Sequence, residues 1–482
     1  MPKAFYDLNT DVLQHILQFV LMPDVSRFMR TCHGAYDLAL PFFTASVDLR
    51  WNPSYQDCCD DKLHGFCNFM LAESNSLEDR PSRLRELRVS LPTHYRDVGL
   101  MGERLLLPPS VAVLFAGVLA RAINLVYLDL TESEVFFLSH PSIADALINQ
   151  CPKLARVSFG QSDRVSMATK WQMRHLKHIS LRCSLLGIGG LLESFACRPT
   201  SLEISVSIPV KLHGDQWGDL VWPQVESLSL SGGTMSANRI SQIFPNLRRL
   251  QYRSGAFGGW WKDRRELRVA KEPLLWKELD YLESGDYTVW HSNLKCHVRE
   301  LCMPFPGSNV QDTTFTEAIL EILRDTTPIS VSLTVSTMAP LDFFIKIPQT
   351  LEKIQFLEIC LLAVWGDDEV APRIIKETVA LLVHLPDAFS KLRATYLRML
   401  FRLPQGYLRA IGAEPQDAFV CELARCVPAL EYVDITWESR PDSAYKSKWY
   451  RFEEREGRPR QVAEIADGHI LRNYWRHRST IS

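Results

Sequence analysis

Three eight-residue stretches share one pattern: 152-PKLARVSF-159, 245-PNLRRLQY-252 and 428-PALEYVDI-435. In each of them, a proline is followed two, five and seven residues later by a large apolar or aromatic side chain. Each stretch also follows an apolar run typical of a helix, and a helix does not easily continue through a proline. Because residues two apart face the same side of a strand, the pattern predicts a turn followed by a short strand with two inward side chains.

The apolar part of this pattern recurs along most of the chain, at intervals that include 22 and 29 residues and longer gaps of 40 to 50. Its copies are Leu84/Leu87/Val89, Leu125/Leu128/Leu130, Leu154/Val157/Phe159, Leu176/Ile179/Leu181, Val225/Leu228/Leu230, Leu247/Leu250/Tyr252, Val298/Leu301/Met303, Leu351/Ile354/Phe356 and Leu430/Val433/Ile435. The short intervals fall in the range of leucine-rich repeats, and runs with one apolar helical face lie between the copies.

The repeat is similar to an irregular leucine-rich repeat, although it lacks the asparagine that usually follows the strand. We therefore expect the α/β fold class, with an irregular solenoid of parallel strands and helices. An ordinary α/β domain with leucine-rich strands is the alternative. In a solenoid the residue between the two inward positions faces the open side of the sheet, where a client protein could bind. These residues are Arg88, Asp129, Ser158, Ser180, Ser229, Gln251, Gln355 and Asp434.

The segment before the repeats reads FYDLNTDVLQHILQFVLMPDVSRFMRTCHGAYDLALPFFTASVDLR over residues 5–50. Asn9 or Thr10 can cap a first helix, which we expect to end at Pro23. Asp24 can cap a second short helix, and a third apolar group is expected to stop at Pro41. Three helices in about 50 residues bury little surface alone, so their apolar faces need a partner within or outside the chain.

This segment resembles an F-box. The residues that carry the resemblance are Leu8, Asp11, Val12, Ile16, Leu17, Val20, Asp24, Val25, Cys32, Tyr36, Pro41, Val47 and Leu49. Asn9 stands where the family usually has proline, and Tyr36 where it usually has tryptophan. The match covers about a tenth of the chain.

The resemblance implies a non-catalytic substrate-receptor subunit of an SCF-type cullin-RING ubiquitin ligase. The helices would dock on a Skp adaptor that joins a cullin scaffold, and the solenoid would recruit a protein client. Carried over by position, the adaptor contacts are Leu8, Val12, Ile16, Leu17, Asp24, Val25, Phe28, Cys32, Tyr36 and Pro41. A leucine-rich-repeat interaction scaffold without ligase function is the alternative. The domain boundaries that follow are 1–50 for the F-box, 51–80 for a linker, 81–437 for the solenoid and 438–482 for a C-terminal cap with a hairpin.

The composition excludes several classes of function. The 482 residues carry 54 Lys and Arg against 56 Asp and Glu, so the chain is not a polycation for nucleic acid. The start of the chain lacks the pattern of a secretory signal, and no apolar run reaches the ~18 residues that span a bilayer. We therefore expect a cytoplasmic or nuclear protein without a membrane partner.

Two other stretches carry residues of the kind that form binding sites. Cys58, Cys59, His64 and Cys67 offer too few ligands at the usual spacing of a zinc site. A basic and aromatic stretch at 239–271 could bind nucleic acid, but a solvated insertion is the favoured interpretation. The chain carries no P-loop, nucleophile elbow or zinc-protease motif, so neither catalysis nor a metal or cofactor is expected.

Overall fold

The computed structural model describes residues 9–50, 59–72, 79–91, 106–160, 173, 175–183, 199–211, 221–234, 237–253, 276–284, 294–304, 313–337, 339–362, 371–402, 414–438, 446–453 and 461–465. The chain forms two compact units, Met1–Leu220 and Val221–Ser482. The division falls inside the stretch expected to be one solenoid, and the expected domain boundaries stay predictions.

Three helices form at the start of the first unit: α1 (Thr10–Leu17), α2 (Met22–Met29) and α3 (His33–Ala45). Asn9 caps α1 as the sequence predicts, because its side-chain oxygen accepts a hydrogen bond from the Asp11 amide at 3.1 Å. Cys32 precedes α3, and its Sγ accepts from the Ala35 amide at 3.4 Å.

The helix boundaries differ from the prediction at both prolines. Pro23 does not end α1, which stops at Leu17; it lies in the first turn of α2, where a missing amide costs no helical hydrogen bond. Consequently Leu21, not Asp24, precedes α2. Pro41 lies inside α3, which continues to Ala45. The packing of the surrounding apolar residues holds the helix together past this proline.

The three helices share a small apolar core. Its buried members are Leu17, Val25, Met29, Ala39 and Leu40. Half-buried apolar residues pack around them: Val20, Phe28, Tyr36, Leu38, Phe42, Phe43 and Phe69. Phe69 belongs to α4 (Cys59–Leu71), so the core of the helical segment extends to the first helix of the repeats.

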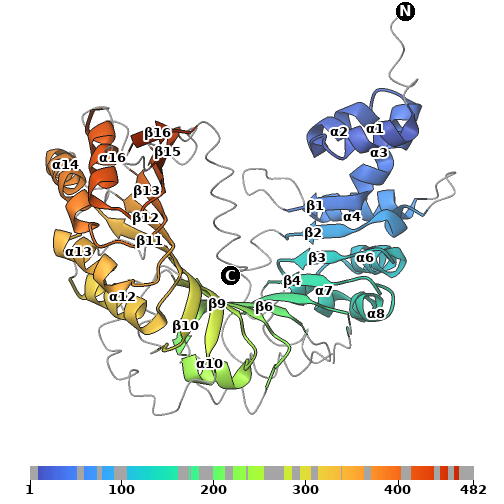
Figure 1. Cartoon of the computed structure of the whole chain (residues 1–482). Coiled ribbons are helices and arrows are strands. Elements are labelled where there is room, and N and C mark those ends of the chain that lie inside the picture. Colours follow the sequence, from blue (N-terminus) through green and yellow to red (C-terminus); the bar gives the residue numbers. More distant parts are fainter. Residues whose placement is uncertain are drawn as a thin grey trace, which may run out of the picture. The chain divides into compact units, whose positions relative to one another are not determined.

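The first unit continues with six strands that pair in chain order, all parallel. They are β1 (Ser46–Leu49), β2 (Glu86–Val89), β3 (Tyr127–Leu130), β4 (Arg156–Phe159), β5 (His178–Cys183) and β6 (Ser201–Lys211). The 3-10 helix η2 (Arg80–Arg83) precedes β2. The helices α4, α6 (Pro109–Arg121), α7 (Ser133–Ser139) and α8 (Pro141–Asn149) lie on one side of these strands (Figure 1).

The second unit repeats the arrangement with eight parallel strands. They are β7 (Ser227–Thr234), β8 (Arg249–Arg253), β9 (Glu278–Ser284), β10 (His297–Met303), β11 (Ser330–Ser336), β12 (Phe356–Leu362), β13 (Tyr396–Arg402) and β14 (Tyr432–Glu438). Its helices are α10 (Ala237–Ile243), α12 (Thr313–Thr326), α13 (Leu341–Thr350), α14 (Ala371–Ala388) and α16 (Glu414–Cys426). At the end of the unit β15 (Lys446–Glu453) pairs antiparallel with β14, and β16 (Gln461–Glu464) pairs antiparallel with β15. The C-terminal cap with a hairpin expected over 438–482 stays a prediction.

The strand register explains the repeated sequence pattern. Leu87, Leu128, Val157 and Ile179 are direct partners on four neighbouring strands, and all are buried. The residues two positions later are also partners and also buried. The two inward positions of the pattern therefore build the core, as the sequence predicts, and the fold within each unit is a mixed α/β repeat of the leucine-rich-repeat kind.

One copy of the pattern is wrong by three residues. The core residues of β12 are Leu357 and Ile359, which pair with Leu397 and Met399 of β13, whereas the expected strand was centred on Ile354 and Phe356. The segment contains two overlapping copies of the pattern, Leu351/Ile354/Phe356 and Ile354/Leu357/Ile359, so both registers satisfy it. Among the described residues, no helix is long and apolar enough to cross a membrane.

Candidate functional site

An exposed group of apolar side chains lies on the first helix and the turn that follows it. Five of the eleven large hydrophobic residues that are exposed in the described part of the chain fall within this short stretch. We call this group the N-terminal apolar surface; its members and exposed fractions are Val12 46%, Ile16 39%, Phe19 75%, Leu21 72% and Met22 43%. Exposed apolar residues are ordinary when scattered, but gathered in one place they mark an interaction site.

The geometry of α1 explains why this surface stays open. Leu13 and Leu17 lie one turn apart and are buried. Val12 and Ile16 are also one turn apart, but each is offset from its buried neighbour by about 100° around the helix, so they face away from the core. The His15 ring meets the Phe19 ring edge-on at 5.1 Å, which widens the apolar surface at its end.

The structure describes nine of the ten residues expected to contact an adaptor, and these nine fall into three groups. Val12 and Ile16 belong to the N-terminal apolar surface. Leu17 and Val25 are buried in the helical core, so they support the fold and have no surface to offer a partner. Leu8 lies outside the described residues.

Of the other five expected contacts, two are exposed and three are half-buried. Asp24 is exposed and forms an ion pair with Arg27 at 2.9 Å, and Cys32 is exposed at the start of α3. Phe28, Tyr36 and Pro41 are half-buried, and the first two pack against the helical core.

The sequence analysis did not identify three members of this surface: Phe19, Leu21 and Met22. Phe19 and Leu21 are its two most exposed residues. Phe19 follows Val12 and Ile16 at helical spacing, a signal that was present in the sequence. Leu21 and Met22 could not be assigned, because their exposure depends on where α2 begins.

The open face of the strands is the second candidate surface. In the first unit Arg88, Asp129, Ser158 and Ser180 are partners in the strand ladder, and all are half-buried. The structure thus brings four of the expected client-binding residues into one row. In the second unit Ser229 and Gln251 are partners in the same way.

A charged aromatic cluster lies beside that row in the first unit. The Tyr127 ring lies between two guanidinium groups, those of Arg88 at 5.3 Å and Arg156 at 5.2 Å from its centre. Glu86 is within 3.7 Å of Arg88 and 3.6 Å of Arg156. Burial and the nearby carboxylate of Asp129 raise the pKa of Tyr127, so its hydroxyl stays protonated. The face offers hydrogen-bond donors and an aromatic ring.

The second unit carries a buried charged triad on the same face. Arg398 Nη1 lies 2.7 Å from Glu358 Oε2, and Arg398 Nε lies 3.0 Å from Asp434 Oδ2. Glu358 also accepts a hydrogen bond from Ser332 at 2.9 Å. Burial lowers the pKa of Arg398, but the two carboxylates raise it more, so the net direction is upward. The one guanidinium pairs with both carboxylates, which leaves the triad one net negative charge, and these internal ion pairs make it a structural element.

Three of the expected client-binding residues differ from the prediction. Ser229 is buried, with 8% of its surface exposed. Gln355 is exposed but lies before β12, and Glu358 occupies the equivalent place in the ladder. This correction follows from the three-residue shift in β12. Asp434 is in the expected row but fully buried in the triad.

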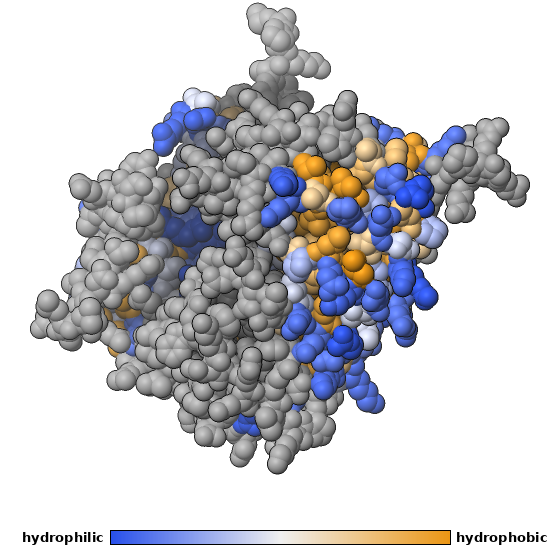
Figure 2. All heavy atoms as spheres, turned by 90° about the vertical axis from the view of Figure 1, so that its left-hand side faces the viewer, coloured by the Kyte–Doolittle hydropathy of each residue, from blue (hydrophilic) through white to orange (hydrophobic). Residues whose placement is uncertain are grey.

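The helical side of the second unit adds no further candidate. Figure 2 shows apolar residues mixed with hydrophilic ones on this side of the molecule. Among the described side chains of its helices, the large apolar residues that are exposed are Ile345 and Val383. Isolated residues of this kind are normal on protein surfaces.

In the described ranges, no three His, Cys, Asp or Glu side chains are placed to hold a metal ion, and Cys58, Trp260 and Trp261 lie outside those ranges.

Comparisons with known proteins concern only the fold. No family model matches the chain, and no curated protein does. Among solved structures, the chain is similar to the leucine-rich repeat-containing protein LegL7 from Legionella pneumophila. The TM-score is 0.32 and the identity 13%, over 66% of this chain and 87% of that protein.

Proposed function

We propose that this chain is a non-catalytic substrate-receptor subunit of an SCF-type cullin-RING ubiquitin ligase. In this proposal α1, α2 and α3 dock on a Skp adaptor, and the open strand face holds a protein client. The adaptor and a cullin scaffold are then its partners, and the cytoplasm or nucleus is its location.

The N-terminal apolar surface is the observation that carries the proposal. Full burial of one exposed large apolar side chain contributes about 1.5 to 3 kcal/mol, and five such side chains, 39% to 75% exposed, lie within residues 12–22. Leu17, Val25, Phe28 and Tyr36 then act behind this surface, because they hold the three helices in place. The F-box resemblance of residues 5–50 supplies the identity of the partner.

The mechanism is positional. A client bound to the strand face would be held near the conjugating enzyme of the ligase, which raises its effective concentration at the transfer site. The row of Arg88, Asp129, Ser158 and Ser180 provides polar and charged contacts of both signs. Such a surface selects a client by complementary hydrogen bonds and ion pairs.

Co-purification with a Skp adaptor tests the proposal. The full chain should retain the adaptor, and the variant Ile16→Asp/Phe19→Asp should lose it. Val113→Asp is the matched control, since Val113 is 51% exposed on α6 and apolar. If the adaptor is not retained, or if all three proteins retain it equally, the chain is a leucine-rich-repeat scaffold without a ligase role.

A further inference from the structure

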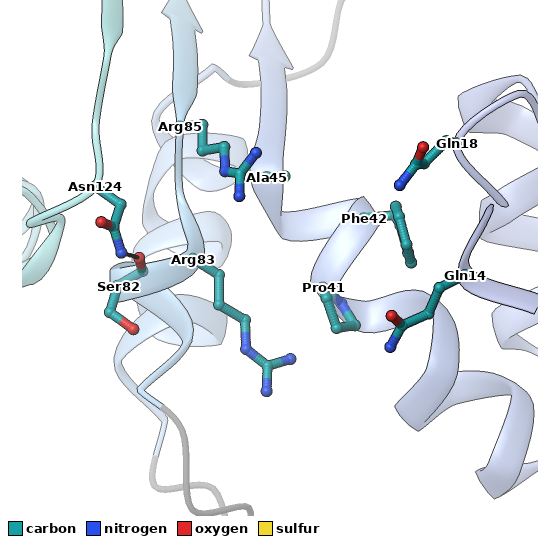
Figure 3. A pocket seen from close by; sticks show the side chains of 9 residues that line it. All are labelled: Gln14, Gln18, Pro41, Phe42, Ala45, Ser82, Arg83, Arg85 and Asn124. Carbon is teal, nitrogen blue, oxygen red and sulfur yellow. Dashed lines mark hydrogen bonds between the residues drawn. The ribbon is translucent and has the colours of Figure 1, made fainter. Parts of the chain in front are cut away.

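A polar cavity lies where the helical segment meets the first repeat. Its volume is about 570 Å³, within the range of sites for small molecules and short peptides. Figure 3 shows side chains from α1 and α3 on one side and from the η2 region and the following strand on the other. The lining residues are Gln14, Gln18, Pro41, Phe42, Ala45, Ser82, Arg83, Arg85 and Asn124.

The cavity is positively charged. Arg83 and Arg85 extend into it, and none of the nine lining residues is acidic. A third cation stands at its edge, because Lys153 Nζ donates a hydrogen bond to Asn124 Oδ1 at 2.6 Å. The Asn124 amide in turn donates to the Ser82 carbonyl at 2.6 Å, which fixes that wall.

Arg85 combines a fixed backbone with an available side chain. Its amide donates to the Ala45 carbonyl at 2.9 Å, and its carbonyl accepts from the amides of Val126 at 2.8 Å and Tyr127 at 3.0 Å. The side chain is exposed, and within the described part of the chain its guanidinium has no hydrogen bond or ion pair. The guanidinium is thus presented from a rigid support with its donors unused.

The opposite wall complements a peptide backbone. Gln14 lies on α1, Gln18 directly follows the last residue of that helix one turn later, and both are exposed. Each side-chain amide both donates and accepts, as the backbone groups of an extended peptide require. Phe42 and Pro41 add a small apolar surface between the polar groups.

We propose that this cavity binds an acidic peptide, with a Glu or Asp carboxylate paired to Arg85. A planar guanidinium with its donors unused matches one carboxylate through two parallel hydrogen bonds. Gln14 and Gln18 then hold the peptide backbone. A phosphate group, which carries nearly two charges, is the competing ligand that the experiment below distinguishes from a carboxylate.

This site is separate from the N-terminal apolar surface. Gln18 is turned by about 200° from Ile16 around α1, so the two surfaces lie on different sides of that helix. The inference goes beyond the proposed function, since an adaptor and an acidic peptide could bind at once. Each can therefore fail in its own experiment without affecting the other.

Fluorescence anisotropy on the full chain tests the site. The probe is a labelled Gly-Glu-Glu-Glu-Gly peptide, and its counterpart Gly-Gln-Gln-Gln-Gly has the same shape without charge. The variant Arg85→Gln removes the guanidinium that is proposed to bind the carboxylate. Arg85→Lys keeps the positive charge but cannot donate two parallel hydrogen bonds. Arg248→Gln is the matched control: Arg248 precedes β8 as Arg85 precedes β2, and its backbone takes the same place in the ladder.

The expected result is binding of the Glu peptide, at least tenfold weaker binding of the Gln peptide, and a loss of roughly tenfold or more in Arg85→Gln. Arg85→Lys should fall between, and Arg248→Gln should bind as the original chain does. Equal binding of both peptides, or equal losses at Arg85 and Arg248, would overturn the proposal. Displacement by inorganic phosphate at concentrations where acetate has no effect would also overturn it, in favour of a phosphate site.

Discussion

Ile16 and Leu17 are neighbours in α1, but Ile16 exposes 39% of its surface and Leu17 only 5%. Leu17 packs into the core of the three helices, whereas Ile16 belongs to the N-terminal apolar surface. A helix of a folded domain normally presents one apolar stripe to its core. In α1 a second set of apolar residues faces outward. The buried set stabilises the fold, and the exposed set is available for contact with a partner.

The first prediction separates these two roles. Leu17→Asp places a carboxylate in the apolar core and should cost about 3 kcal/mol or more. Ile16→Asp introduces the same charge at the exposed neighbour and should change stability by no more than about 0.5 kcal/mol. Urea unfolding of the full chain, followed by circular dichroism, measures both. Equal losses of stability would mean that Ile16 is part of the core.

The second prediction concerns the buried triad. Arg398→Met leaves the carboxylates of Glu358 and Asp434 buried without their counter-ion, and should destabilise the second unit by about 3 to 5 kcal/mol. Arg425→Met is the control, because Arg425 pairs with Glu422 at the surface. The unfolding midpoint of the Arg425→Met variant should stay unchanged. Similar midpoints for the two variants would show that the triad is not a buried ion cluster.

The third prediction tests the repeat register. Leu128 is fully buried at an inward position of β3, so Leu128→Ala should lower the free energy of unfolding by about 2 to 5 kcal/mol. Ser158 faces the open side at the partner position of Asp129, and Ser158→Ala should be nearly neutral. Differential scanning calorimetry compares the two variants. The reverse order of stability would contradict the assigned faces.

The fourth prediction is an alkaline loss of stability. Burial raises the pKa of the Cys67 and Cys151 thiols from 9.0 to about 12. As the pH rises above about 9, these thiols lose their protons in the unfolded chain but not in the folded one, so stability falls up to about pH 12. Urea midpoints measured from pH 8.5 to 10.5 should decline, and the slope should be smaller in Cys67→Ala/Cys151→Ala. The same slope in both proteins would contradict the prediction.

The sequence predicted the repeats where strand and turn residues differ clearly. Pro152 and Leu154 fix the start of β4, because the proline excludes a continuing helix and the following residues alternate. The predicted register was wrong at β12, where Leu357, Glu358 and Ile359 lie in a segment in which more than one register places apolar residues at the inward positions. The pattern also has no copy in β9, because Ser284 stands at the second inward position.

The candidate surfaces were predictable only in part. Helical spacing places Ile16 and Leu17 on adjacent flanks of α1, but spacing alone does not tell which flank faces the core. That choice depends on how α1 packs against α3, a tertiary contact with no local signal. The cavity at Arg85 was not predicted at all, since its lining residues come from segments up to 110 positions apart, Gln14 to Asn124.

Calorimetric titration of the purified chain with a Skp adaptor tests the central claim most directly. The account predicts saturable binding to the original chain, with a negative heat-capacity change from burial of the N-terminal apolar surface. Ile16→Asp should weaken this binding at least about tenfold while Val113→Asp leaves it unchanged. No binding to the original chain, or the same affinity for Ile16→Asp, would contradict the account.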